Sequence, residues 1–313
     1  MTALRPRRVQ EPGAFGHVAL LVGGDSAERE VSLTGGRDVA AAFQRCGISH
    51  ETFDGARALF QAIDAGRVDR VFNLMHGPGG EDGAIQGALQ LLNVPVTGSD
   101  VLGSALTMDK IRSKQLWTQT GIPTAPFLVI GPEETSFHTV FEAFTAPVFV
   151  KPTGLGSSIG VSRVMTAADL PAAVALARQH SATVVVEQGI TGGEYFVGIL
   201  NGEALPLIRI ETPHEFYDYA AKYESDTTRY YCPCGLPAEQ EAQLSRLALE
   251  AFTALQASGW GRVDLILDAD GTPWFLEVNT APGMTDHSLV PQAAAELGVG
   301  FDELVWRILE TSL

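Results

Sequence analysis

The stretch GWGRVDLILDADGTPWFLEVNTAPGMTDHSLVP, residues 259–291, carries the strongest structural pattern in the chain. Polar and apolar residues alternate at first over 262–268 and again over 273–279, with Ala269-Asp270-Gly271 between the two runs. A period of two is typical of β-strands, and Asp and Gly favour a turn. The pattern therefore predicts a β-hairpin.

One face of this hairpin combines acidic, amide and basic side chains. Residues two apart on a strand share a face, so Arg262 and Asp264 point to the same side. Glu277 and Asn279 do the same on the partner strand. Carboxylate and amide oxygens suit Mg²⁺, whereas an ion pair across the strands between Arg262 and an acid would account for the same residues. The residues alone leave both interpretations open.

The same stretch partly matches the calcium loop of an EF-hand. The matching residues, at positions 3, 5, 6 and 12 of that loop, are Asp268, Asp270, Gly271 and Glu277. Position 1 would be Ile266, which has no side-chain atom that binds a metal ion. The flanking runs also have the pattern of strands, whereas an EF-hand has helices there. These mismatches exclude an EF-hand.

Length and charge limit the classes of protein. With 313 residues, of which 45% are hydrophobic, the chain is long enough for about two or three domains with sizeable cores. The formal net charge of −16 opposes sequence-independent binding to nucleic acid or to an anionic membrane. We therefore expect no nucleic-acid or membrane partner, and we expect any bound polyanion to be small and complexed with metal.

Targeting signals and cysteine usage indicate the compartment. No apolar run reaches transmembrane length, and the basic start of the chain is followed by polar residues and a proline instead of an apolar signal core. Cys46, Cys232 and Cys234 lack the spacing of a zinc site, and their odd number fits a reducing environment. We expect a cytoplasmic protein in which the cysteines have no functional role.

The first part of the chain has the pattern of an α/β domain. Residues 1–16, rich in Arg, Pro and Gly, are expected to form a flexible leader. Residues 17–98 then alternate strands and helices, which predicts a parallel sheet. The expected strands are 17–22 and 70–75, and the expected helices are 33–46, 56–63 and 84–92.

Glycine-rich turns follow both of these strands. They are GGDSAERE at 23–30 and HGPGGEDG at 76–83. Open α/β sheets bind ligands at such strand ends, although the absence of a full G-x-G-x-x-G pattern disfavours a dinucleotide. His76, directly after the second strand, is either functional or structural on this evidence.

A third glycine-rich segment, PTGLGSSIGV at 152–161, lies between two β-like runs and follows Lys151. Its unobstructed backbone N–H groups could bind phosphates, but a plain hairpin turn would have the same composition. It is not a Walker loop, because its lysine precedes the glycines. Lys110 lies between two predicted helices at 101–107 and 111–120, where a lysine is more often a solvated surface charge than a site residue.

The segment 212–231 differs from the rest of the chain. Five of the six tyrosines lie between Tyr217 and Tyr231, mixed with charged residues and without a period. Long loops in compact domains are usually functional or disordered, and the aromatic content favours the former. We therefore predict a lid over a site.

Seven segments, in order and over nearly the whole chain, resemble the D-alanine–D-alanine ligase family, which has the ATP-grasp fold. They are GGDSAEREVSL (23–33), HGPGGEDGAIQG (76–87), ALTMDKIRSK (105–114), KPTGLGSSIGVS (151–162), FYDYAAKY (216–223), GWGRVDLILD (259–268) and EVNTAPGMTDHSLVP (277–291). The resemblance implies a parallel-sheet N-terminal domain followed by two α+β domains that sandwich ATP. The implied boundaries are a leader at 1–16, an N-terminal domain at 17–98, a central domain at 99–186 and a C-terminal domain at 187–313 with its lid at 212–231.

The resemblance also implies an activity for peptidoglycan precursor synthesis. ATP phosphorylates the carboxylate of one D-alanine, and the amine of a second D-alanine attacks the acyl phosphate. Two Mg²⁺ ions would assist, with Mn²⁺ able to replace them, and the protein would be a homodimer. Because a carboxylate must approach a triphosphate, cations at the site have to neutralise both anions.

Individual roles follow from the matching positions. The Mg²⁺ ligands would be Asp264, Glu277 and Asn279. The phosphates would be held by Lys110, Lys151 and Lys222, and the adenine and ribose by Glu187 and Glu194. Glu28 would bind the ammonium of the first D-alanine in a hydrogen-bonded trio with Ser157 and Tyr223, close to His76. Arg262 and the Gly283 N–H would stabilise the oxyanion, and Ser288 and Leu289 would bind the carboxylate of the second substrate.

The chain departs from the family at two nucleotide contacts. Gly189 stands where some relatives carry a tryptophan beside adenine, and Gly154-Leu155 replaces a charged pair in the phosphate loop. A D-alanine–D-lactate ligase is an alternative of the same fold, but depsipeptide-forming relatives tend to lack the tyrosine found at Tyr223. A catalytically idle nucleotide-binding protein is a further alternative, disfavoured because every ionisable residue that the chemistry needs is present.

Overall fold

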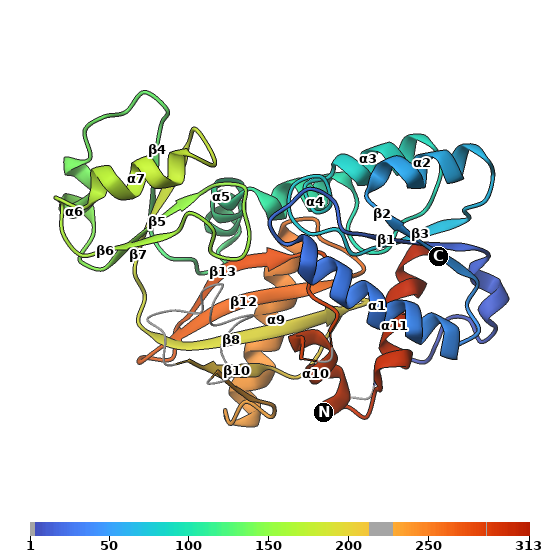
Figure 1. Cartoon of the computed structure of the whole chain (residues 1–313). Coiled ribbons are helices and arrows are strands. Elements are labelled where there is room, and N and C mark those ends of the chain that lie inside the picture. The colour runs from blue at the N-terminus through green and yellow to red at the C-terminus, as the bar shows by residue number, and fades with distance from the viewer. Residues whose placement is uncertain (1–3, 213–227, 286) are drawn as a thin grey trace.

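The computed structural model describes residues 4–212, 228–285 and 287–313, which form three β-sheets covered by helices (Figure 1). The N-terminal sheet has the strand order β2-β1-β3, with both pairs parallel. Its strands are β1 (Val18–Val22), β2 (His50–Asp54) and β3 (Arg70–Asn73). The helices that follow them are α1 (Arg29–Arg45), α2 (Ala56–Asp64) and α3 (Ala84–Leu91).

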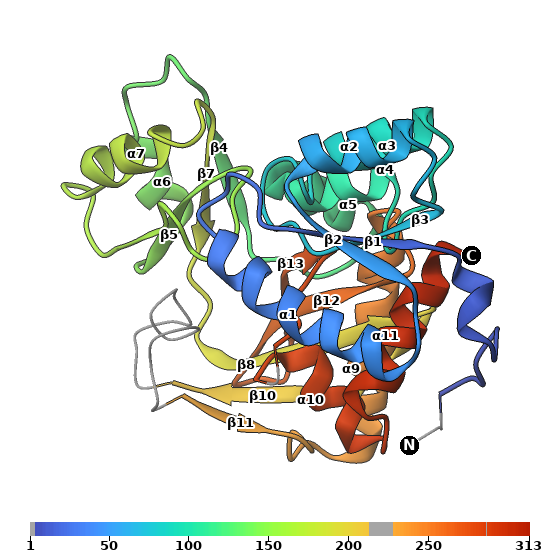
Figure 2. The ribbon, with the colours of Figure 1, turned by 45° about the vertical axis from the view of Figure 1, so that its right-hand side comes forward.

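Strand β1 is buried on both faces, which explains its continuous apolar sequence. Val18 and alternate residues after it pack with α1 and with α11 (Phe301–Leu309). Ala19 and Leu21 pack on the opposite face, with α2 and α3. Figures 1 and 2 show the two groups of helices on either side of this sheet. The parallel α/β domain expected from the sequence is therefore present.

The central sheet has the order β4-β7-β5-β6, and all of its neighbours are antiparallel. Its strands are β4 (Phe127–Ile130), β5 (Val148–Pro152), β6 (Ser162–Val164) and β7 (Val184–Gln188). Two helices, α6 (His138–Ala143) and α7 (Leu170–Arg178), pack on it. Two more, α4 (Val101–Met108) and α5 (Lys110–Thr120), connect it to the N-terminal sheet, and Asp100 and Asp109 cap their N-termini.

The third sheet has the order β11-β10-β8-β12-β13, with β9 paired to β8. Its strands are β8 (Gly192–Leu200), β9 (Glu203–Ala204), β10 (Ile208–Glu211), β11 (Arg229–Tyr231), β12 (Trp260–Asp268) and β13 (Pro273–Asn279). The remaining helices are α9 (Ala238–Ala254), α10 (Leu289–Glu296) and the short η2 (Glu310–Ser312). None of the helices within these described segments is long and apolar enough to cross a membrane.

The predicted hairpin at 259–291 is confirmed as the antiparallel pair β12 and β13. Val263, Leu265 and Val278 belong to the core beneath α9, so the polar residues between them face the other side of the sheet. The register places Asp264 opposite Glu277 before a bulge that follows Asp264. One apolar face therefore anchors the hairpin, and the polar face is available for a site.

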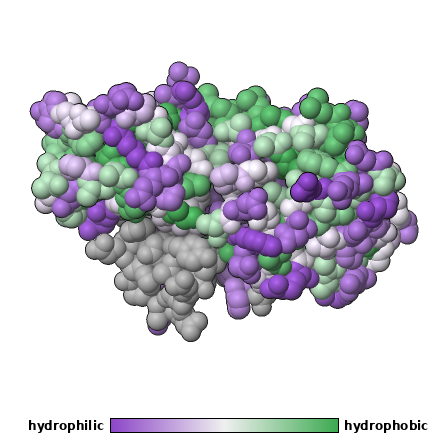
Figure 3. Space-filling model, turned by 45° about the horizontal axis from the view of Figure 1, so that its top comes forward, coloured by the Kyte–Doolittle hydropathy of each residue, from purple (hydrophilic) through white to green (hydrophobic). Residues whose placement is uncertain are grey.

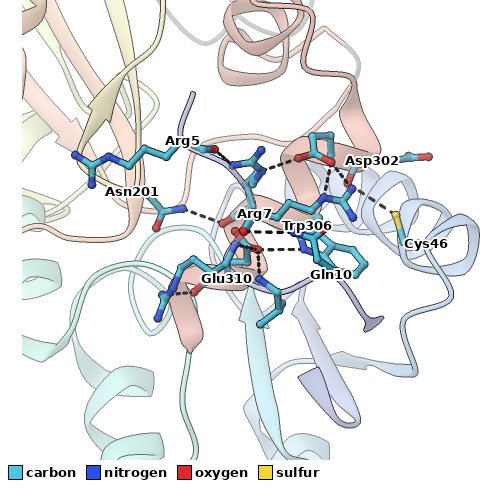
Figure 4. Close-up of polar contacts among 12 residues, drawn as sticks. Arg5, Arg7, Gln10, Cys46, Asn201, Asp302, Trp306 and Glu310 are labelled. Carbon is cyan, nitrogen blue, oxygen red and sulfur yellow. Dashed lines mark hydrogen bonds and ion pairs between the residues drawn. The ribbon is translucent and has the colours of Figure 1, made fainter. Parts of the chain in front are cut away.

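Residues 4–16 differ from the flexible leader expected from the sequence, because they pack along α11 (Figure 4). Arg7 forms an ion pair with Glu303, and its guanidinium carbon lies 4.1 Å from the centre of the Trp306 ring. Arg5 is paired with Glu203 at 3.6 Å. These partners lie far from the leader in the sequence, so no local pattern could reveal them.

The buried Glu310 side chain, 1% exposed, holds the backbone of the same segment. Its Oε1 atom accepts hydrogen bonds from the backbone N–H groups of Arg8 and Val9, at 2.7 and 3.1 Å. Phe15, in the 3-10 helix η1 (Pro12–Phe15), is fully buried against Trp306. The start of the described chain is thus part of the same core as α1 and α11.

Besides the short 3-10 helices, three elements were not expected from the sequence. Strand β11 pairs with β10 inside the segment 212–231 that was predicted as a lid, so residues 229–231 belong to the third sheet instead. The edge strand β2 has the polar sequence HETFD, of which one residue is fully buried. Helix α10 begins after Ser288 and contains Pro291 in its first turn, where a proline removes no helical hydrogen bond. Helix α1 also begins earlier than expected, at Arg29, directly after the glycine-rich turn.

Candidate active site

The polar face of the hairpin holds a tight cluster of charged and amide groups. Arg262 Nε and Nη2 donate to the two oxygens of Asp264 at 2.6 and 2.7 Å. Asn279 Nδ2 donates to Asp264 Oδ2 at 3.3 Å. The ion pair foreseen as an alternative therefore exists, but along one strand rather than across two, and it coexists with the proposed ligand set.

Lys110 connects this face to the glycine-rich segment. Its Nζ lies 3.2 Å from Glu277 Oε2 and donates to the backbone oxygen of Leu155 at 2.7 Å. The Lys110 side chain is only 12% exposed, so it is not the solvated surface charge that the sequence also allowed. The helix cap of Asp109 fixes the start of α5 and thereby the position of this lysine.

The donor set of Asp264, Glu277 and Asn279 fits Mg²⁺ in its chemistry. Two carboxylates and an amide supply only oxygen, and Mg²⁺ usually takes one or two carboxylates together with substrate phosphates and water. Over residues 4–212, 228–285 and 287–313, no group of three or more His, Cys, Asp or Glu side chains could hold a metal ion. A metal here would therefore depend on the amide and on oxygens of a bound substrate.

A second charged group lies on β5, β7 and α5. Lys151 Nζ contacts Glu187 Oε2 at 2.7 Å, and Lys114 Nζ lies 3.5 Å from Glu187 Oε1. Burial works to raise the pKa of Glu187, but Lys114 and Lys151 outweigh it and hold that pKa below its ordinary value. Glu187 is therefore ionised although it is only 3% exposed. Lys114 was not singled out from the sequence.

A pocket of about 340 Å³ lies between the central and third sheets. Its polar lining includes the expected Lys110, Lys151, Glu187, Glu194, Asp264 and Glu277. Its apolar lining includes Ala125, Phe149, Ile190, Ile266 and Leu276. A small second pocket shares Lys110, Leu155 and Glu277 with it and reaches Gly156, Asn279 and Glu81. The two pockets together form a continuous path along the hairpin face.

The glycine-rich segment meets the N-terminal domain at Glu28. Ser157 Oγ donates to Glu28 Oε1, and a side chain at Gly156 would have its Cβ 3.2 Å from Glu28 Oε2. Ser157 has the positive φ of 52°, an uncommon conformation for serine. Strands β5 and β6 pair on either side of this segment. The segment therefore connects the two strands of a hairpin, as one of the two interpretations of the sequence predicted. It also contacts Glu28 through Ser157.

His76 lies close to the same contact and is buried, with 5% of its surface exposed. Burial lowers the pKa of His76, although the nearby Glu28 carboxylate acts in the opposite direction. The imidazole is thus neutral near pH 7 and can act as a hydrogen-bond partner without adding charge.

Glu81, within the HGPGGEDG segment, was not identified as a site residue from the sequence. Its two carboxyl oxygens accept from the N–H groups of Gly77 at 2.7 Å and Ala281 at 3.2 Å, which joins the loop after β3 to the end of β13. Burial raises the pKa of Glu81 to about 8, and the Glu28 charge adds to this effect. An acidic residue among glycines usually signals an exposed turn, so its burial had no local signature.

The loop after β13 brings Gly283, Ser288 and Leu289 together. A Cβ atom at Gly283 would lie 3.0 Å from Ser288 Oγ, and Ser288 is the N-cap residue of α10. Thr285 N donates to Ser288 Oγ at 2.9 Å. The side chain of Leu289 is buried, so of the expected carboxylate contacts only its backbone N–H is suitable. A helix N-terminus with a hydroxyl group favours an anion.

Some of the expected site residues lie outside the described residues, and the structure gives a physical reason for one departure from the family. Tyr223 and Lys222, and the lid residues 213–227, lie outside them. A Cβ atom at Gly189 would lie 2.5 Å from the backbone oxygen of Pro147, so the backbone there leaves no room for the tryptophan found in some relatives. At Gly154 a Cβ atom would meet nothing within 4 Å. The departure at Gly154 is therefore not enforced by packing.

An antiparallel sheet facing a second sheet across a pocket lined with lysines and carboxylates defines the class of ATP-grasp proteins. The chain matches the family described as "D-ala D-ala ligase C-terminus" over residues 116–310 and the one described as "D-ala D-ala ligase N-terminus" over residues 48–99. The chain therefore belongs to the D-alanine–D-alanine ligase family.

Individual relatives are similar to this chain over nearly the full length of both sequences. The chain is 53% identical to the D-alanine–D-alanine ligase of Methylococcus capsulatus over 306 residues, covering 98% of this chain and 99% of that one. It is 50% identical to D-alanine–D-alanine ligase B of Xanthomonas campestris pv. campestris over 317 residues, covering 100% and 99%. The crystal structure of the D-alanine–D-alanine ligase of Bacillus anthracis complexed with ATP has a TM-score of 0.83 and 30% identity, covering 95% and 97%.

Proposed function

We propose that this protein joins two D-alanine molecules to D-alanyl-D-alanine with hydrolysis of ATP to ADP, for peptidoglycan precursor synthesis. One observation carries the proposal: the charged face of β12 and β13 lines the nucleotide-sized pocket with Asp264 and Glu277, and the adjoining small pocket reaches Asn279. The relatives described above are ligases of this type and agree with this chain along its length.

The first step joins a substrate carboxylate to the terminal phosphate of ATP. In the proposal, Glu28 and Ser157 hold the ammonium of the first D-alanine at the edge of the glycine-rich segment. Lys110 and Lys151, which both line the pocket, bind the phosphates. The carboxylate oxygen attacks the phosphorus, the bond to ADP breaks, and an acyl phosphate forms. Cations are needed because two anions react.

Asp264, Glu277 and Asn279 are the residues that would hold Mg²⁺, with two ions and replacement by Mn²⁺ as the family resemblance implies. When bound there, the metal would supply neutralisation of the charge on the reacting oxygens. The chain itself contributes the oxygen donors on one rigid hairpin, and the pairing of Asp264 with Glu277 in the strand register keeps the two carboxylates adjacent.

In the second step the amine of the other D-alanine attacks the acyl carbon and phosphate leaves. Arg262 and the backbone N–H of Gly283 are the proposed donors to the oxyanion of the tetrahedral intermediate. Ser288 and the start of α10 are proposed to bind the carboxylate of this second substrate. Tyr223 and Lys222, which complete the proposed set, come from the family resemblance alone.

A phosphate-release assay with D-alanine, L-alanine and D-lactate tests the proposal. We expect ADP formation only when Mg²⁺ and D-alanine are both present, and we expect D-alanyl-D-alanine as the product. Equal turnover with L-alanine, or none with D-alanine, would reject the function. Tyr223→Phe should shift the product ratio in a D-alanine and D-lactate mixture toward the depsipeptide, which separates the peptide ligase from the D-lactate alternative.

We further propose a cytoplasmic homodimer. Leu91 and Leu102, on the neighbouring helices α3 and α4, are 85% and 54% exposed. Figure 3 shows hydrophobic atoms in green on the side of the molecule where these helices lie. Exposed leucines that lie together favour a protein contact. Sedimentation analysis of Leu91→Glu/Leu102→Glu, with a monomer expected, tests this surface.

The boundaries at residues 17–98, 99–186 and 187–313 are proposed as domain boundaries. The N-terminal sheet lies within 17–98 and the third sheet within 187–313, whereas β7 (Val184–Gln188) of the central sheet extends two residues beyond 186. Limited proteolysis with and without ATP is the test: cleavage near residue 98 and in the connection between β7 and β8, reduced by ATP, is expected.

A further inference from the structure

Lys114 is a fully buried lysine on α5, with 0% of its surface exposed. Its ammonium donates to Thr124 Oγ1 at 2.7 Å and to the backbone oxygen of Ala125 at 3.1 Å. It also lies 5.4 Å from the centre of the Phe127 ring. A lysine is rarely buried without a partner that requires its charge.

That partner is Glu187, whose two carboxyl oxygens are divided between two lysines. Oε2 contacts Lys151 Nζ at 2.7 Å, and Oε1 lies 3.5 Å from Lys114 Nζ. Lys151 and Glu187 line the nucleotide-sized pocket, and Lys114 is not among its lining residues. Lys114 therefore approaches the carboxylate from behind, whereas Lys151 approaches it from inside the pocket.

Burial lowers the pKa of Lys114 to about 8, and Glu187 acts in the opposite direction. Lys114 in turn contributes to keeping the pKa of Glu187 below its ordinary value. The two groups thus stabilise each other's charged form in a place that excludes water.

The pocket around Glu187 has the composition of a nucleobase site. Phe149, Ile266 and Leu276 provide apolar surfaces on which a flat ring can lie, and Ala125 lies beside them. The carboxylate of Glu187 accepts hydrogen bonds but donates none while it is ionised. It therefore suits the exocyclic amino group of adenine and opposes the carbonyl oxygen that guanine carries at the same place.

We infer that Lys114 is a positioning residue for nucleobase recognition, which anchors Glu187 from behind so that its carboxylate is presented to the amino group of adenine. The inference rests on the proposed function for the identity of the nucleotide. Lys114 itself touches neither base nor phosphate. Its contribution is to selectivity between adenine and guanine nucleotides, because a fixed acceptor discriminates better than one that can turn or take up a proton.

Calorimetric titration of ADP and GDP in the presence of Mg²⁺ tests the inference on Lys114→Met, which keeps the length of the side chain without its charge. We expect wild type to prefer ADP and the variant to bind ADP about 10-fold more weakly, as for loss of a hydrogen bond to a charged group. GDP binding should change little, so the ratio of the two affinities should fall. An unchanged ratio in a folded variant would overturn the inference.

Trp117→Phe is the matched control. Trp117 lies on the same helix, is equally buried, and donates to the backbone oxygen of Ala251 at 2.9 Å, away from Glu187. The Trp117→Phe variant should have a lower Tm, whereas its ratio of ADP to GDP affinity should stay at the wild-type value. The same fall in the ratio for Trp117→Phe would show a general effect of α5 and would also overturn the inference.

Thr124→Val provides a second test if Lys114→Met does not fold. It removes the partner at 2.7 Å from Lys114 Nζ without changing any charge. We expect a smaller fall of the ADP to GDP ratio in the same direction, and no fall would count against Lys114 as the anchor. If the wild type binds neither nucleotide, the proposed function and the inference are both rejected. If the wild type binds ADP and Lys114→Met has the same ratio of ADP to GDP affinity, only the inference is rejected.

Discussion

Replacement of Arg262 by alanine tests the oxyanion role and the buried ion pair together. Arg262 makes two hydrogen bonds to Asp264, at 2.6 and 2.7 Å, and the two side chains are 14% and 5% exposed. Its guanidinium carbon lies 5.3 Å from the centre of the Phe196 ring. The variant therefore removes a cation from a nearly dry site and leaves a carboxylate behind.

The structure allows a magnitude to be assigned to each effect. Removal of one partner from a buried pair costs about 3–5 kcal/mol, because the remaining charge is uncompensated. Asn279 still donates to Asp264 at 3.3 Å, so we expect a loss near the lower end, about 3 kcal/mol, in the free energy of unfolding without ligands. Loss of an oxyanion donor should reduce kcat about 10²- to 10³-fold.

Ligands should change the two effects differently. Mg²⁺ with ADP gives the Asp264 carboxylate a new cation, so the loss of stability in Arg262→Ala should shrink when both are added. The loss of kcat should persist, since the oxyanion donor is still absent. Arg262→Lys is the matched control, because it keeps the charge and loses the paired geometry, and it should lose less stability than the alanine variant.

Chemical denaturation with and without Mg²⁺ and ADP, followed by phosphate release at saturating substrates, measures both effects. A folded Arg262→Ala variant with nearly wild-type kcat would refute the oxyanion role. An equal loss of stability with and without Mg²⁺ and ADP would refute the role of Asp264 as a metal ligand.

Three further predictions concern the rest of the molecule. Glu310→Gln weakens the acceptor for the N–H groups of Arg8 and Val9, so the free energy of unfolding should fall by about 1–3 kcal/mol. Urea titrations measure this loss, kcat/KM should stay unchanged, and an unaltered denaturation midpoint would contradict the role of Glu310. The raised pKa of Glu81, about 8 against an ordinary 4.5, means that the folded chain keeps a proton which the unfolded chain releases, so its contribution to stability falls as pH rises between these values. Glu81→Gln should therefore gain stability relative to wild type from pH 5 to pH 8 in denaturation experiments, and parallel pH profiles would disprove the assignment. Replacement of all three cysteines by alanine should preserve activity in the phosphate-release assay. Cys46, Cys232 and Cys234 are free thiols, and burial raises their pKa values. An inactive but folded variant would show that one of them acts at the site.

The hairpin was predictable because its information is local. Alternation over 262–268 and 273–279 determines which side chains share a face, and the turn residues determine where the chain reverses. The observed register places Asp264 opposite Glu277, followed by a bulge that the alternation does not predict. The roles assigned to these residues stay predictions.

Lys114 and Glu81 were missed because their environments are made by distant segments. Lys114 follows Lys110 by one helical turn and has the local pattern of a charged helix surface, yet its partner Glu187 comes from β7. Glu81 lies among glycines, yet one of its donors is Ala281 at the end of β13. Side chains of this kind can be recognised only when the strands and helices have been assembled.

The ion pairs of the site have a direct bearing on the proposed chemistry. The acids Glu277, Glu187 and Asp264 are paired with Lys110, Lys151 and Arg262 at distances between 2.6 and 3.2 Å. Each pair neutralises a group that would otherwise be a buried, uncompensated charge in the absence of ligands. In the proposed reaction, Asp264 and Glu277 would exchange their cations for the metal when a metal–nucleotide complex binds, while Lys110 and Lys151 would exchange a carboxylate for phosphate. The net charge buried at the site would then change little, so the ion pair and the proposed ligand site, which were alternatives in the sequence, would be two states of the same residues.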